Sequence, residues 1–155
     1  MLEVIRTTEG GVTRQQGTYT RYNFRGQAVW KVSPEAIALP ANLADIEQYP
    51  DLLNEVAGNF QYISDTSGLI EVTNYAAATT ATATTAGSVD RFVSSTVVMR
   101  GDRGAPVLQE AFTYFVQSGG GSTVMPLATR TTYPNTTAAG AQTTTDTYRR
   151  PELKR

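Results

Sequence analysis

The sequence contains no histidine and no cysteine among its 155 residues. Without cysteine the chain has no disulfide and no thiol nucleophile, and without histidine it lacks the side chain best suited to proton transfer near neutral pH. Most zinc and iron sites also depend on these two residue types. The sequence therefore predicts no catalytic residues, no cofactor and no metal centre.

Charge is scarce as well, because charged side chains make up 17% of the residues and the formal net charge is -1. A nucleic-acid-binding face usually needs clustered basic residues, so we predict no nucleic-acid partner. No apolar run approaches the roughly 20 residues of a membrane-spanning helix, so no membrane span is predicted. Residues 1–6 lack the apolar core of a secretion signal.

Threonine is the commonest residue and alanine is second. Threonine is β-branched and suits exposed strand faces. A polar, weakly charged and threonine-rich surface is common in extracellular β-proteins. We therefore expect one β-rich domain over residues 1–155, located outside the cell or on its surface.

The stretch 18–32 shows the predicted architecture most clearly, as two strands joined at a turn over residues 23–26. Tyrosine, threonine, valine and tryptophan favour a pleated, half-buried surface, while asparagine and glycine supply the backbone angles of a tight turn. On the second arm, alternation places Ala28, Trp30 and Val32 on one face.

Further hairpins are predicted along the chain, each with short β-rich arms around a turn sequence. The paired arms are residues 2–8 with 12–16, 59–64 with 69–75, 89–99 with 105–117, and 123–133 with 141–148. The glycine-rich stretch 118–122 is predicted to be a flexible loop.

The remaining segments are interpreted as insertions or ends. A helical insertion is expected over 33–58, beginning with a short turn after Ser33 and continuing as helix near 42–57, in two pieces because Pro50 interrupts it. The Ala/Thr-rich stretch 76–88 has no large apolar side chain, so it is a loop, a linker or a plain edge strand. The tail 149–155 is expected to fray.

A loose repeat connects several hairpins, in which an aromatic residue and a few polar residues precede a glycine and a β-rich arm. Residues 20–30 read TRYNFRGQAVW and resemble the YD-repeat, or Rhs, family, in which Tyr-Asp, a short turn and a glycine precede such an arm. Asn23 stands where that family usually has aspartate. Residues 66–75 and 132–148 are similar, and the resemblance covers about half of the chain.

In that family, repeats wind a long sheet into a hollow shell around a C-terminal cargo, commonly a toxin, and some members act at cell surfaces or contact carbohydrate. The resemblance implies a curved, repeat-built sheet of consecutive antiparallel hairpins, with flanking repeats or a cargo domain as partners. The family's Asp-Pro signature of self-cleavage is not present in this sequence. The expectation is therefore a fragment or short relative that serves as a non-enzymatic shell or scaffold segment.

A carbohydrate-binding or adhesin module is the alternative function. Trp30, Tyr22 and Tyr19, with Phe24 nearby, are the candidate ligand-binding residues, because aromatic rings stack on sugars. Aromatic side chains in strands are more often core or cross-strand partners, so both roles stay open.

Two acidic motifs have weaker functional interpretations. Asp45, Glu47, Asp51 and Glu55 suggest a carboxylate pair of a glycoside hydrolase or a calcium site, but a solvated helix face explains them as well. Residues 100–102 read Arg-Gly-Asp, an integrin-like tripeptide that also suits a hairpin tip. The hydrolase is the least favoured function, since such enzymes usually need a longer scaffold to form a cleft.

Overall fold

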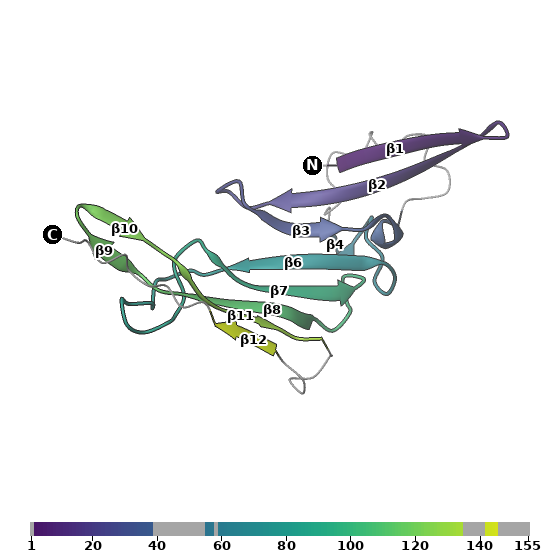
Figure 1. Ribbon diagram of the computed structural model, residues 1–155. Helices are drawn as coiled ribbons and strands as arrows, with labels where there is room; N and C mark the ends of the chain where they lie inside the picture. The colour runs from purple at the N-terminus through teal and green to yellow at the C-terminus, as the bar shows by residue number, and fades with distance from the viewer. Residues whose placement is uncertain (1, 39–54, 58, 135–141, 146–155) are drawn as a thin grey trace. The chain divides into compact units, whose positions relative to one another are not determined.

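Antiparallel strands are the main secondary structure of the described chain, and most of them pair with a neighbour in the sequence (Figure 1). The computed structural model describes residues 2–38, 55–57, 59–134 and 142–145. The chain divides into two compact units, one comprising Met1–Thr73 and Val97–Val107, the other Asn74–Thr96 and Leu108–Arg155. The prediction of a mainly β, antiparallel fold is confirmed.

Unit 1 contains a sheet whose strands follow the order of the chain. Its strands are β1 (Leu2–Glu9), β2 (Val12–Tyr22), β3 (Ala28–Val32) and β6 (Leu69–Tyr75), in the order β1-β2-β3-β6, and the end of β7 (Val93–Arg100) follows β6. β2 is one continuous strand that pairs with β1 on one side and with β3 on the other. It therefore serves two of the predicted hairpins at once.

The turns before and after β2 both lie at the glycine-containing positions that the sequence predicted. Gly10 and Gly11 link β1 to β2 with positive φ angles of 59° and 78°. At the β2–β3 turn, the Asn23 side-chain oxygen accepts hydrogen bonds from the backbone N–H groups of Arg25 and Gln27, at 2.9 and 3.0 Å. An asparagine side chain that bonds to the backbone two residues ahead stabilises such a turn.

The core of unit 1 lies on one face of this sheet. The register places Tyr19 opposite Val32 and Val32 opposite Ile70. The short 3₁₀-helix η1 (Pro34–Ala36) supplies Ala36, which is fully buried, and Ile63 is 3% exposed. The buried cluster consists of Val32, Ala36, Ile63 and Ile70.

The prediction that residues 59–64 pair with 69–75 is wrong. β6 pairs with β3 instead, while β5 (Asn59–Phe60) forms a two-residue ladder with β4 (Glu55–Val56). Tyr62 and Ile63 are buried, and Ile63 bridges to Ile37. Burying Ile63 in one cluster with Ala36 of η1 takes precedence over the local hairpin pattern.

The helical insertion is confirmed only at its start. Pro34 opens η1, as its fixed φ angle favours. The predicted helix near 42–57 is wrong at its end, because Glu55–Val56 is a strand. Residues 39–54 lie outside the described residues, as does the tail 149–155.

Unit 2 is also antiparallel. It contains part of β7 and most of β8 (Val107–Tyr114), then β11 (Leu127–Thr132) and β12 (Gln142–Thr145), in the order β7-β8-β11-β12. The predicted third hairpin, β7–β8, and the last pair, β11–β12, are present. The flexible loop predicted at 118–122 is wrong, because β9 (Gln117–Gly119) and β10 (Ser122–Val124) form a hairpin around Gly120 and Gly121, both with positive φ.

The Ala/Thr-rich stretch 76–88 is a loop whose shape is fixed by side-chain hydrogen bonds. The Thr80 hydroxyl oxygen accepts a bond from the Ser88 backbone N–H at 2.9 Å, and the Ser88 hydroxyl donates to the Ala78 carbonyl at 2.8 Å. Ala81 is only 8% exposed. Of the three interpretations of this stretch, the loop is the one that the structure shows.

The strand faces of unit 2 are only partly covered. Every residue of β8 is half-buried. A strand with one face on a core usually alternates buried and exposed residues, and β8 does not show this alternation. An edge-to-face contact joins the rings of Phe92 and Tyr114 at a centroid separation of 5.1 Å. The Tyr114 hydroxyl donates to the Val93 carbonyl at 2.9 Å, and burial raises the pKa of this tyrosine.

Candidate functional site

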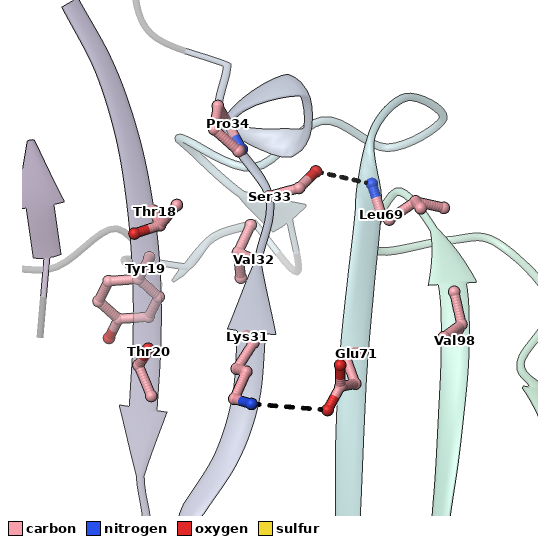
Figure 2. A pocket seen from close by; sticks show the side chains of 10 residues that line it. All are labelled: Thr18, Tyr19, Thr20, Lys31, Val32, Ser33, Pro34, Leu69, Glu71 and Val98. Atoms are coloured by element: carbon pink, nitrogen blue, oxygen red, sulfur yellow. Dashed lines mark hydrogen bonds and ion pairs between the residues drawn. The ribbon is translucent and has the colours of Figure 1, made fainter. Parts of the chain in front are cut away.

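An open groove lies within unit 1, where residues of β2, β3, β6 and β7 line it (Figure 2). Its volume is about 440 Å³. Thr20 lies opposite Lys31, and Lys31 lies opposite Glu71, so these side chains share one face across β2, β3 and β6. The residues that line it are Thr18, Tyr19, Thr20, Lys31, Val32, Ser33, Pro34, Leu69, Glu71 and Val98. We call this feature the β2–β6 groove.

One ion pair crosses the groove. The Lys31 ammonium Nζ lies 3.8 Å from the Glu71 carboxylate Oε1, and Figure 2 shows the two side chains pointing toward each other. The two side chains are 64% and 47% exposed. An exposed pair of this kind contributes about 0–1 kcal/mol, so either partner is free to bind an incoming charge instead.

The end of the groove is held by Ser33. Its hydroxyl oxygen accepts a hydrogen bond from the Leu69 backbone N–H at 2.9 Å, and its own N–H donates to the Leu69 carbonyl at 2.9 Å. This double link joins the end of β3 to the start of β6. Leu69 is nevertheless 58% exposed, so the groove presents apolar surface beside its charged and hydroxyl groups.

The predicted carbohydrate-binding residues do not form one exposed platform. Tyr19 and Trp30 pack against the buried cluster, although Tyr19 also lines the groove. The Trp30 ring makes an edge-to-face contact with Phe60 at a centroid separation of 5.7 Å. Tyr22, near the β2–β3 turn, is 46% exposed. The structure thus gives Trp30 a packing role and leaves Tyr22 the more accessible ring.

The most exposed large apolar side chain of the described residues is Phe24, at 91%. It lies in the β2–β3 turn, and the Arg25 guanidinium carbon lies 4.9 Å from its ring centroid. We call this feature the Phe24 tip. Its position between Asn23 and Gly26 in the sequence indicates exposure, because a residue at the tip of a turn has no strand face to pack on.

The Arg-Gly-Asp tripeptide is not presented as an open tip. Gly101 is buried, and its N–H donates to the Gly68 carbonyl at 3.0 Å, while the Asp102 N–H donates to the Ser64 carbonyl at 3.0 Å. Burial, and then the negative charge of Asp65, raise the pKa of Asp102. This loop therefore fastens β7 to the preceding turn.

Most of the acidic residues predicted as a hydrolase or calcium site lie outside the described residues. Asp45, Glu47 and Asp51 lie outside the described residues, and Glu55 is exposed in β4. Across the described ranges, no group of three or more potential metal ligands lies together. Within the same ranges, no helix has the length and apolar character to cross a membrane.

Comparison with known proteins gave no matching family model, no matching curated protein and no matching solved structure.

Proposed function

We propose that this chain is a non-enzymatic structural segment, a section of repeat-built β-sheet in a YD-repeat-like bacterial surface or secreted protein. Its role is that of a shell or scaffold, with flanking repeats or a cargo domain as partners. The observation on which this proposal rests is the succession of antiparallel strands whose faces and edges are incompletely covered. A curved arrangement of the repeats and an extracellular location belong to the same proposal.

The edges of the sheets support assembly with further β-structure. Among the described strands, β1 pairs only with β2, and β12 pairs only with β11. A strand with one neighbour presents a row of unpaired N–H and C=O groups on its other side. β1 spans eight residues, which is long for an unprotected edge.

Exposed apolar side chains on the strands support the same proposal. Ile5 in β1 and Leu69 in β6 are each 58% exposed, and Val124 in β10 is 46% exposed. Single exposed apolar residues are common on protein surfaces. Here they accompany strands such as β8 that have no buried face, which favours a sheet that other structure covers.

Size-exclusion chromatography with light scattering, combined with thermal unfolding of residues 1–155, tests this function. We expect association that increases with concentration, or a broad melt, because the sheet edges are open. A monomer at every concentration with a sharp, cooperative melt would instead indicate an autonomous module. Substrate turnover that is lost when an aspartate or glutamate is replaced would contradict the non-enzymatic role.

A carbohydrate-binding or adhesin module is the second candidate function. It is favoured by the β2–β6 groove, where the threonine hydroxyls of β2 lie beside Tyr19 and the Lys31–Glu71 pair. A glycan array tests it, with Trp30→Ala and Lys31→Ala as variants whose folding is checked by circular dichroism. Binding that survives Trp30→Ala removes the site predicted from sequence, and binding that is lost in Lys31→Ala places the glycan in the groove.

A further inference from the structure

Unit 1 displays both halves of a contact, a projecting aromatic side chain and an open groove with apolar surface. We propose that the Phe24 tip of one copy of this chain binds in the β2–β6 groove of a second copy, so that copies associate head to tail. This inference rests on the proposed structural function and names the partner that covers one of the open sheet faces.

The Phe24 tip is held in a fixed shape by its own turn. The Asn23 N–H donates to the Gln27 carbonyl at 2.9 Å, and the Gly26 N–H donates to the Asn23 carbonyl at 3.0 Å. The Asn23 side-chain amide donates to the Gln27 side chain at 2.8 Å. Because the turn is ordered before binding, docking Phe24 costs little conformational entropy.

The groove offers what a phenylalanine ring needs. Leu69, Val98 and Pro34 supply apolar surface along it, and its volume of about 440 Å³ admits one aromatic ring. Phe24 is 91% exposed, so it does not occupy the groove of its own chain. An exposed aromatic side chain that enters a partner's pocket is the usual form of a binding hot spot.

Charge favours the same pairing. Arg25 accompanies Phe24, and Arg21 is exposed on the strand that leads to the tip. At the groove, Glu71 is 47% exposed, and the exposed Glu35 follows the groove residue Pro34. Lys31 and Glu71 offset each other in the groove, so the acidic residue that remains to attract the arginines is Glu35.

The geometry of the contact determines how the assembly grows. The tip and the groove are different surfaces, so the interface is heterologous, and such contacts build rings or open filaments rather than closed twofold dimers. One aromatic side chain buries roughly 150–250 Å². That area is well below the roughly 1,000 Å² of a stable interface, so each contact is weak and depends on concentration.

Sedimentation velocity of the whole chain over a range of concentrations tests the contact. We expect Phe24→Ala and Leu69→Lys each to raise the apparent dissociation constant at least about tenfold, the usual loss at a hot spot. Both side chains are largely exposed, at 91% and 58%, so the variants retain the fold, as circular dichroism will verify. Val124→Ala, at another exposed apolar residue, is the matched control and should associate like the unmodified chain.

An equimolar mixture of the two variants identifies the head-to-tail arrangement. Phe24→Ala keeps the groove and Leu69→Lys keeps the tip, so the mixture should form one-to-one dimers that do not grow further. A mixture that stays monomeric overturns the proposal. Association that persists in both single variants also overturns it, while leaving the structural function in place. An unmodified chain that remains monomeric overturns it too, and counts against the structural function as well if its melt is sharp.

Discussion

At the scale of single residues, two turn glycines with nearly the same backbone angle have different surroundings. Gly26 and Gly68 have φ angles of 74° and 72°, but a Cβ on Gly26 would meet nothing within 4 Å, whereas one on Gly68 would clash with the backbone of Ala36. We expect Gly26→Ala to lower the free energy of unfolding by about 1–2 kcal/mol. Gly68→Ala should cost several kcal/mol more, measured by urea unfolding, and equal losses would contradict the close packing of η1 on this turn.

A second prediction at the scale of single residues concerns Asp102 and the pH dependence of stability. Burial and then the charge of Asp65 raise its pKa, while the Arg103 guanidinium, 3.5 Å from Asp65, acts in the opposite direction. An acid whose pKa is higher in the folded state binds its proton more tightly there, so its contribution to stability is present at low pH and is lost as pH rises through the folded pKa.

Asp102→Asn removes this loss, because asparagine stays neutral. We expect the variant to be more stable than the unmodified chain at pH 7, and nearly equal to it in acid where Asp102 is protonated. Thermal unfolding of both proteins, at pH 7 and at successively lower pH, measures the difference in stability. A variant that is less stable at pH 7 would show that the carboxylate is a favourable partner in the loop.

At the scale of elements, the loop 76–88 tests how far side-chain hydrogen bonds determine the shape of a segment that has no large apolar side chain. Thr80→Ala removes the acceptor of the Ser88 N–H, so we expect a loss of about 1 kcal/mol and faster proteolysis within the loop. Thr84→Ala is the matched control, since its hydroxyl makes no hydrogen bond in the described part of the chain. Equal proteolysis of the two variants would mean that the Thr80 hydroxyl does not hold the loop.

Sequence patterns identified those elements whose turns are local. The Gly10–Gly11 turn and the Asn23–Gly26 turn define their hairpins, because the backbone angles that each needs are supplied by residues inside the turn. The strand 69–75 was also predicted, yet its partner was not, since β6 pairs with β3 across a long separation in sequence. Such pairing depends on where Tyr62 and Ile63 are buried, which alternation along one strand does not reveal.

The candidate site was predicted less well than the strands. Trp30 and Tyr19 were selected for their chemistry, but alternation alone does not show that their face is the one that packs on the buried cluster. The β2–β6 groove combines side chains from four strands, and its composition depends on registers that the sequence does not specify. The sequence places Phe24 in a turn, but only the structure shows that its side chain is 91% exposed.

At the scale of the whole molecule, the central claim is that the sheet surfaces of this chain become covered through assembly. The exposed edge of β1 and the open groove across β2, β3 and β6 are the described surfaces at which covering would be detected. Amide hydrogen exchange detects it directly, because an N–H that gains a partner or loses solvent contact exchanges more slowly.

The most direct measurement is therefore amide hydrogen exchange of residues 1–155, compared between dilute and concentrated samples. The account predicts slower exchange at high concentration in the groove strands β2, β3 and β6 and along the outer edge of β1. Exchange that is identical in both samples at every one of these strands would contradict it and would show a self-sufficient module whose open surfaces do not assemble.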